Sequence, residues 1–301
     1  MANLLTTATK IRTPRPHKIV VYGVPGIGKT SFACNAPDPI VIGTEDGSSR
    51  YGATETQVAK TIEDIEETLN GLLKISEYKS VVVDALDGIE SLCDEWVCRE
   101  RKVKSIEDIG YGKGTVMANE KFASLVKIFE ELRQSGRNVV LIAHSHVKTV
   151  NDPTLTAAYD RHQLKLREKN SAKVSEWADA VLFATYEMYV KTDNAKSTKG
   201  KAYGDGKRVV YTERRPAWDA KNRDGLPLCM ELSWAAYEQA LNRPGPEIAQ
   251  GLRDEALFLI DSFSERDPGL SEVMKKTVLD AGQNVERLRE ISNRIKMRIE
   301  Q

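Results

Sequence analysis

The sequence predicts an α/β fold with a mainly parallel central sheet that helices cover on both faces. Short apolar runs rich in Val and Ile alternate with longer segments that have helical apolar spacing. In addition, the first apolar run is followed directly by a glycine-rich loop that opens a helical segment. Apolar strands joined by helices are typical of parallel sheets that are buried on both sides.

The strands and helices of this core are expected in a regular order. We expect strands at residues 18–22, 39–43, 80–84, 138–143 and 180–190. Residues 61–75 have apolar side chains at helical spacing, and residues 89–101 and 116–136 are also expected to be helical. Gly136 marks the end of the last of these helices.

The chain changes character after Val190. Residues 191–215 contain eight Lys or Arg against three acidic residues, with three interspersed glycines. We interpret this stretch as a β-hairpin with a basic tip. One further strand is expected at 228–232, a linker at 242–246, and helices at 247–264, 270–281 and 284–300. The chain therefore divides into an N-terminal arm at 1–17, a core at 18–243 and a small C-terminal helical region at 244–301.

Composition limits the classes of function. The 44 Lys and Arg balance 44 Asp and Glu, so nucleic-acid binding would depend on local basic strips. The four cysteines lack metal-finger spacing. No apolar run reaches the roughly 18 residues of a membrane span, and the N-terminus lacks the apolar region of a signal peptide. These features predict a cytoplasmic protein with reduced thiols and no membrane partner.

The loop after the first strand reads GVPGIGKT and matches the pattern G-x-x-x-x-G-K-[ST]. Between a strand and a helix, this pattern predicts a site for ATP. Its glycines let backbone N–H groups turn toward phosphate oxygens, and the helix start adds a favourable dipole. Lys29 is expected to reach the β- and γ-phosphates, and the Thr30 hydroxyl to bind Mg²⁺. The predicted nucleotide-binding residues are Gly23, Val24, Pro25, Gly26, Ile27, Gly28, Lys29, Thr30 and Ser31.

Acidic residues at two strand ends are candidates for metal binding and hydrolysis. Asp84 ends the run SVVVD, where P-loop proteins hold Mg²⁺. It could instead cap a helix, although Asp87 is the better candidate for a cap. Because Ala85 follows Asp84, no acid stands beside it, which disfavours an AAA+ arrangement. We therefore expect Glu45, or else Asp46, to polarise the attacking water, unless the segment is only a solvated turn.

Taken together, these motifs resemble the RecA-type ATPase core. The resemblance makes Glu45 the catalytic glutamate and Asp84 the metal-site aspartate. It places His144 where RecA has a glutamine that senses the γ-phosphate. The alternatives for His144 are a backbone-bonded histidine or half of a metal site with His146.

A further match lies downstream, where Ala-Lys-Asn-Arg at 220–223 is similar to the K-N-K element of RecA. The resemblance implies that Lys221 and Arg223 reach the ATP of a neighbouring subunit and stabilise transition-state charge. A solvated turn is the alternative for this segment.

A narrower resemblance is to phage-encoded RecA-like ATPases of the single-strand annealing group. It is carried over residues 18–234 by GVPGIGKTSFA, TEDG, VVVDALDGIE, GYGKG, AHSH and WDAKNRDGLP. It implies single-stranded DNA as a partner, self-association into a ring or filament, and a single-strand DNA-binding protein as a further partner. Residues 99–115 and 146–173 correspond to the loops that would face DNA, and both interleave basic residues with tyrosine. The candidate DNA-binding residues are Arg101, Lys102, Lys104, Lys113, Lys148, Arg161, Lys165 and Arg167.

The expected function is DNA-stimulated ATP hydrolysis by an oligomer that binds single-stranded DNA and promotes annealing or homologous recombination. The alternative is a P-loop switch or loader that acts on a protein partner without intrinsic DNA binding. A small-molecule kinase is disfavoured, because the third acid and the Lys-Asn-Arg element would have no role in it.

Overall fold

A computed structural model describes residues 15–44, 51–191, 201–242, 253–254, 256–257, 259–260, 268–282 and 284–299. The chain falls into two compact units, Met1–Tyr237 and Glu238–Gln301. Four parts of the sequence-based interpretation lie outside the described residues: most of the N-terminal arm, Glu45 with Asp46, the tip of the basic hairpin at 192–200, and the linker after Asn242.

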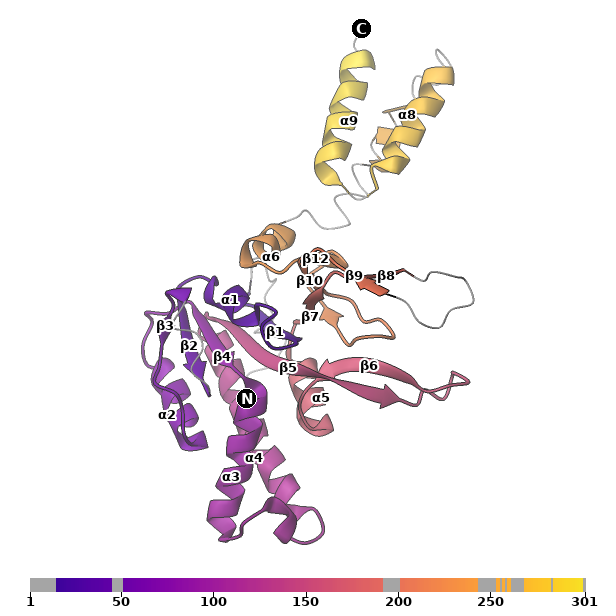
Figure 1. The fold of residues 1–301 in the computed structure, drawn as a ribbon. Helices are drawn as coiled ribbons and strands as arrows, with labels where there is room; N and C mark the ends of the chain where they lie inside the picture. The colour runs from indigo at the N-terminus through magenta and orange to yellow at the C-terminus, as the bar shows by residue number, and fades with distance from the viewer. Residues whose placement is uncertain are drawn as a thin grey trace, which may run out of the picture. The chain divides into compact units, whose positions relative to one another are not determined.

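A single large sheet forms the centre of the first unit (Figure 1). Within the described residues its strand order is β12-β10-β7-β1-β5-β4-β2-β3, with β11 paired to β7 and β6 paired to β5. The strands are β1 (Lys18–Gly23), β2 (Pro39–Gly43), β3 (Thr54–Glu55), β4 (Ser80–Asp84), β5 (Asn138–Val150), β6 (Tyr159–Leu164), β7 (Ala180–Tyr186), β10 (Arg208–Tyr211), β11 (Lys221–Asn222) and β12 (Cys229–Glu231). Strands β8 (Tyr189–Lys191) and β9 (Lys201–Tyr203) form a separate antiparallel pair. The hairpin expected at 191–215 is thus shorter than predicted, because residues 208–211 form β10, which pairs with β7 of the main sheet.

The central strands are parallel. Strand β1 pairs in parallel with β5 on one side and β7 on the other. The parallel part continues through β4, β2 and β3. Among the described residues of this sheet, the antiparallel pairs are those formed by β6, β10, β11 and β12. The prediction of an α/β fold with a mainly parallel sheet is confirmed.

Helices cover both faces of this sheet (Figure 1). Their bounds are α1 (Lys29–Cys34), α2 (Ile62–Leu72), α3 (Leu86–Arg101), α4 (Lys113–Gln134), α5 (Glu168–Trp177) and α6 (Trp234–Leu241). Helices α2 to α5 share one apolar core with alternate strand residues such as Val20 and Tyr22. The rings of Phe32 in α1 and Trp234 in α6 lie 5.4 Å apart. The buried face of α2 is the apolar stripe expected from its spacing, and a capping box of Thr61 and Asp64 begins the helix.

The two segments expected to be DNA-facing loops are more ordered than the sequence indicates. Strand β5 runs on to Val150 and forms a hairpin with β6, in which Val150 pairs with Tyr159. The outer half of β5 is not buried on both faces, so it lacks the apolar run that revealed the inner half. In the other segment, α3 extends to Arg101, a short 3₁₀ turn spans Ile106–Asp108, and α4 begins at Lys113.

The second unit contains helices α8 (Pro268–Asp280) and α9 (Val285–Ile299), close to the predicted bounds. A small apolar core joins them to the described part of residues 253–260 through Ala256, Ile260, Val278, Ala281, Leu288, Ile291 and Ile295. Among the described residues, no helix has the length and hydropathy needed to cross a membrane.

Candidate functional site

The glycine-rich loop leaves the carboxyl end of β1 between two neighbouring strands. Gly23 pairs with His144 of β5 and Ala184 of β7. A Cβ atom on Gly23 would lie 2.2 Å from the carbonyl oxygen of Ala184, so glycine is required there. Gly28 has a φ of 111°, which favours glycine, and the fully buried Ile27 anchors the loop. The loop therefore has the strand–loop–helix setting that the motif requires.

Lys29 is held inside this loop. Its side chain is 6% exposed, and Nζ donates to the carbonyl oxygens of Gly23 at 3.1 Å and Val24 at 3.0 Å. Burial lowers the pKa of Lys29, while the charges of Asp84 and Asp87 act in the opposite direction. A buried ammonium group whose hydrogen-bond partners are neutral carbonyls favours an anionic ligand such as a phosphate.

Thr30 and Asp84 form the candidate metal site. The Thr30 hydroxyl donates to Oδ2 of Asp84 at 2.6 Å, which joins the start of α1 to the end of β4. A hydroxyl and a carboxylate are oxygen ligands of the kind that Mg²⁺ prefers, so the pair fits this ion. No group of three or more His, Cys, Asp or Glu side chains among the described residues could hold a metal by itself. A Mg²⁺ ion held by Thr30 and Asp84 would therefore also need ligands from nucleotide and water, and the idea of a metal site at His144 and His146 loses support.

Thr44, the residue before Glu45, is fixed against the backbone of Asp84 and Ala85. The Thr44 amide donates to the Asp84 carbonyl at 2.8 Å, and the Thr44 hydroxyl accepts from the Ala85 amide at 3.3 Å. A Cβ atom on Gly88 would lie only 2.2 Å from this hydroxyl, so α3 approaches closely here. Glu45 itself lies outside the described residues, and its role as the catalytic base stays a prediction.

His144 lies at the same end of the sheet, beside the start of the glycine-rich loop. Its ring Nδ1 is 2.9 Å from Oδ2 of Asp87, and its backbone amide donates to Oδ1 of Asp87 at 3.2 Å. The N-cap residue of α3 is Ala85, without a side-chain cap bond. The idea that Asp87 caps the helix is therefore wrong, because its carboxylate is turned to the neighbouring strand. This contact orients the histidine at the position expected for a γ-phosphate sensor.

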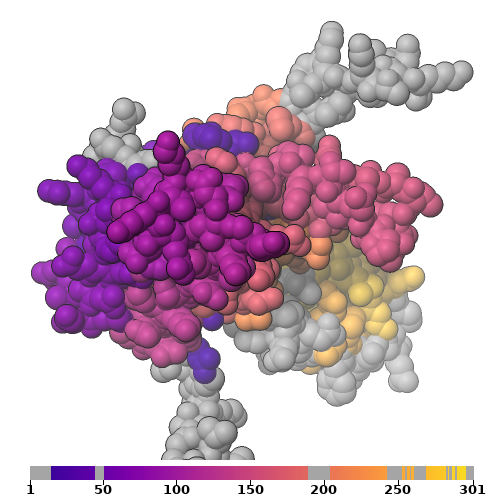
Figure 2. Space-filling view, turned by 90° about the horizontal axis from the view of Figure 1, so that it is seen from below, coloured from indigo at the N-terminus to yellow at the C-terminus, as the bar shows by residue number. Residues whose placement is uncertain are grey.

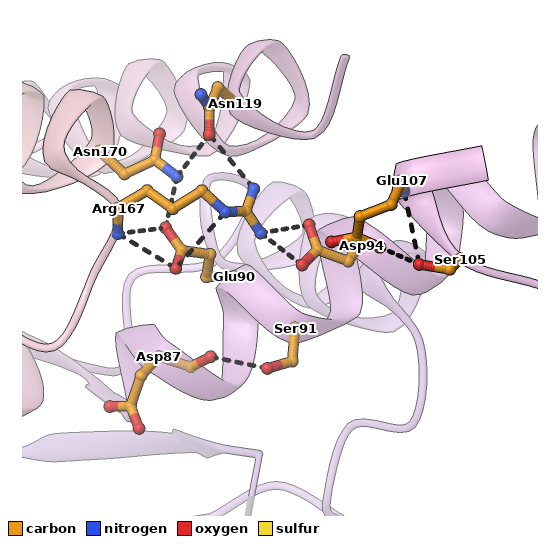
Figure 3. Close-up of polar contacts among 9 residues, drawn as sticks. All are labelled: Asp87, Glu90, Ser91, Asp94, Ser105, Glu107, Asn119, Arg167 and Asn170. Atoms are coloured by element: carbon orange, nitrogen blue, oxygen red, sulfur yellow. Dashed lines mark hydrogen bonds and ion pairs between the residues drawn. The ribbon is translucent and has the colours of Figure 1, made fainter. Parts of the chain in front are cut away.

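Helix α3 also carries a polar cluster that braces α5 (Figure 3). Glu90 accepts hydrogen bonds from the Arg167 amide at 3.0 Å and from the buried Asn170 side chain at 2.6 Å. The Arg167 guanidinium pairs with Asp94 and donates to Asn119 at 3.3 Å. Arg167 was a candidate DNA contact, but it lies inside this cluster because the acidic side chains of α3 bind both its backbone and its side chain.

Arg161 is likewise directed inward. Its side chain is buried, with Nε donating to the Pro216 carbonyl at 3.0 Å and Nη1 lying 3.3 Å from Asp219. Arg161 and Arg167 are therefore removed from the candidate DNA surface, because folding turns both toward internal carboxylates and carbonyls.

The other DNA candidates remain exposed. Arg101, Lys102, Lys104 and Lys113 surround the turn between α3 and α4, where Tyr111 is fully exposed. Lys148 is exposed on the β5–β6 hairpin, and Lys165 is exposed at its base, 3.8 Å from Asp87. Figure 2 shows the face on which the α3–α4 end lies in front and the hairpin extends to one side.

The Lys-Asn-Arg element lies at the opposite end of the sheet from the glycine-rich loop. Lys221 of β11 pairs with Val181, which in turn pairs with Val20, three residues before Gly23. At about 3.3 Å per residue, this separates Lys221 from Gly23 by about 10 Å along the strand. Lys221 and Arg223 are therefore not brought to the loop of their own chain.

Both cations of this element have local partners. The Nζ atom of Lys221 donates to the carbonyl oxygens of Ser175 at 2.7 Å and Glu176 at 2.8 Å. Burial, followed by the charge of Arg223, lowers the pKa of Lys221. The Arg223 side chain is 59% exposed and lies 3.6 Å from Asp179. The solvated-turn alternative thus describes Arg223 better than Lys221.

Sequence reasoning gave no individual role to Arg208, which stood only within the basic segment. A Cβ atom on Gly28 would lie 3.1 Å from Nη1 of Arg208, so the guanidinium reaches the glycine-rich loop. No local signal marks this residue, because β10 comes to β7 only through tertiary pairing.

The buried lysine, the threonine–aspartate pair and the strand–loop–helix geometry define a P-loop nucleotide site. A family model described as "AAA domain" matches residues 15–224, and the chain belongs to this family. The match supports a P-loop ATPase domain over this part of the chain.

Two individual proteins are also similar to the chain. The SPbeta prophage-derived uncharacterized protein YorG of Bacillus subtilis (strain 168) is 24% identical over 135 residues, covering 42% of this chain and 40% of that protein. The chain thus matches less than half the length of this relative. Among solved structures, the KaiC-like protein PH0186 of Pyrococcus horikoshii OT3 has a TM-score of 0.34 and 13% identity, covering 69% of this chain and 85% of that chain.

Proposed function

We propose that the protein is a Mg²⁺-dependent, RecA-like ATPase that binds single-stranded DNA as an oligomer and promotes annealing or homologous recombination. The observation that carries this proposal is the continuity of β5. This one strand begins in the core, passes His144 beside the P-loop, and continues to Lys148 on an exposed hairpin. The same rigid element thus belongs to the nucleotide site and to a basic surface.

The nucleotide site supplies the hydrolytic part of the proposal. Lys29 binds phosphate oxygens, and Thr30 with Asp84 would hold Mg²⁺, which neutralises phosphate charge when bound. Glu45 polarises the attacking water, and His144, oriented by Asp87, reports whether the γ-phosphate is present.

The DNA surface is built from the β5–β6 hairpin and the α3–α4 turn. The hairpin forms one wall of a groove of about 750 Å³, which α5 and residues 219–223 complete. Cationic groups in this groove come from Lys148, Arg214, Lys221 and Arg223, against Glu168, Glu176 and Asp219. On the α3–α4 turn, the exposed Tyr111 stands among lysines, an arrangement suited to base stacking and phosphate neutralisation.

The position of the Lys-Asn-Arg element supports self-association. Arg223 is exposed and far from the P-loop of its own chain, so it can act on a nucleotide only if a second subunit presents one. An oligomer with ATP at the subunit boundaries satisfies this requirement, and a single-strand DNA-binding protein is a further partner that the proposal includes.

The test is ATP hydrolysis measured with and without single-stranded DNA, together with DNA binding by fluorescence anisotropy over a range of salt concentrations. We expect DNA to raise the hydrolysis rate, and we expect the double variant Lys104→Ala and Lys148→Ala to weaken binding and flatten the salt dependence. Lys74→Ala, which removes an exposed lysine just after α2, is the matched control.

If single-stranded DNA neither binds nor changes the rate, the DNA part of the proposal fails. Nucleotide-dependent binding of a protein partner under those conditions would identify the molecule as a protein-directed switch or loader instead.

A further inference from the structure

Arg208 brings a second cation to the P-loop from within the same chain. Its Nη1 and Cδ atoms lie 3.1 and 3.9 Å from the position that a Cβ atom on Gly28 would occupy. The residue is exposed, and neither a hydrogen bond nor an ion pair of its side chain is found within the described part of the chain. A guanidinium with five donors that pairs with no described residue is available to an anion.

The backbone of Arg208 is fixed on both sides. It pairs with Tyr186 at the carboxyl end of β7, and its carbonyl accepts from the Leu232 amide at 3.2 Å. The Leu232 side chain also reaches the loop, with Cδ2 at 3.6 Å from the same Cβ position on Gly28. Strand β10 and the residue that follows β12 therefore place a cation and an apolar group against one side of the P-loop.

This side is opposite to the hydrolytic groups. Strand β1 has β7 and β10 on one side, and β5 and β4 on the other. Asp84 ends β4 and His144 lies in β5, so the metal and the γ-phosphate sensor belong to the β5 side. Arg208 approaches the P-loop from the β7 side, away from Asp84 and His144.

We propose that Arg208 binds a phosphate that ATP and ADP have in common, the α- or β-phosphate, and so sets nucleotide affinity without contributing to the chemical step. This inference rests on the proposed function, because it assumes a nucleotide on the P-loop. Together, Lys29 and Arg208 hold the polyphosphate chain from two sides, so nucleotide affinity does not depend on assembly.

Arg208→Ala tests this assignment, with Arg208→Lys and the neighbouring Lys207→Ala as comparisons. The Lys207 side chain pairs with Glu187 at 2.9 Å. Lys207→Ala therefore removes the same net charge as Arg208→Ala without changing a residue that contacts the P-loop. Dissociation constants would be measured for ATP, ADP and inorganic tripolyphosphate, and kcat and KM for ATP hydrolysis.

We expect Arg208→Ala to raise the dissociation constants of all three ligands by a similar factor. This factor should be on the order of 10-fold or more for the loss of one charge-assisted hydrogen bond. KM should rise while kcat changes less than about two-fold, because uniform binding is lost. Arg208→Lys should recover part of the affinity, and Lys207→Ala should match the wild type.

Three results would overturn the inference. The first is that Arg208→Ala binds all three ligands as tightly as Lys207→Ala does. The second is weaker ATP binding and a lower kcat with unchanged ADP binding, which would mean that Arg208 contacts the γ-phosphate; the third is weaker binding of both nucleotides with unchanged tripolyphosphate binding, which would mean that it contacts the nucleoside. Failure of the wild type to bind ATP would instead refute the proposed function, so the two failures are distinguishable.

Discussion

Strands β10 and β11 pair with the same edge of β7 but reach opposite ends of it. At the carboxyl end, β10 places Arg208 against the P-loop. At the amino end, β11 places Lys221 over the last carbonyls of α5 and leaves Arg223 exposed. Both segments are antiparallel additions to a parallel core, and both carry basic residues, yet only β10 brings one to the P-loop of its own chain.

The difference shows that the role of a basic residue depends on which end of β7 it lies beside. In a parallel sheet, the carboxyl ends of the strands gather the ligand-binding loops on one side. A cation at the amino end therefore lies away from the nucleotide loop of its own chain. Lys221, with two carbonyl partners, stabilises its own subunit, whereas Arg223 is exposed and is the residue that we propose acts on a second subunit.

The largest expected effect is at the carboxyl end, where Lys29→Ala should lower ATP hydrolysis by at least about 100-fold, because the loss of one preorganised donor to a charged transition state costs that much. Steady-state phosphate release is the measurement, with circular dichroism to confirm folding. Lys74→Ala is the control. Full retained activity of Lys29→Ala would contradict the assignment of the site.

The second prediction combines a variant at each end of the sheet. If Arg223 acts across a subunit boundary, Lys29→Ala and Arg223→Ala should each hydrolyse ATP poorly alone. A mixture of the two should regain up to about a quarter of wild-type activity, because random pairing creates some boundaries with both residues intact. Activity would be followed after mixing at a fixed total concentration. Absence of any recovery in mixed oligomers would count against a shared site.

A smaller effect separates the two cations at the amino end. Lys221→Ala removes two hydrogen bonds to the carbonyls that end α5, and should lower the free energy of unfolding by about 1 kcal/mol. Arg223→Ala removes only an exposed ion pair and should change it by less than about 0.5 kcal/mol. Urea denaturation of both variants measures this difference. Equal losses would mean that Arg223 also has a structural role.

The smallest expected effect concerns the middle of β7, where the His162 ring lies 5.0 Å from that of Phe183. Burial lowers the pKa of His162, and its Nδ1 has no partner among the described residues. The unfolded chain therefore binds a proton more readily, so stability should fall as pH drops through about 6.5, the ordinary histidine value, toward the lower folded pKa.

His162→Phe should make the urea midpoint less sensitive to pH between 7.5 and 5.5. An unchanged pH dependence in this variant would show that other groups control acid stability in this range.

The local pattern was enough to predict much of the site. GVPGIGKT could be assigned because its chemistry is contained in consecutive residues, and Asp84 because a buried strand ends there. The outer half of β5 could not be predicted in the same way, since its exposed residues lack a continuous apolar run. The inward direction of Arg161 and Arg167 was also hidden, because their partners Asp219 and Asp94 are distant in sequence.

The sequence by itself determined the class of fold and the position of the phosphate loop, since both follow from short-range periodicity and a contiguous motif. Only the tertiary structure decided which basic residues outside this loop approach it, which brace the core and which remain exposed. Those roles depend on strand order and on the end of β7 that each antiparallel strand reaches, and pairing between distant segments leaves no signal in the local sequence.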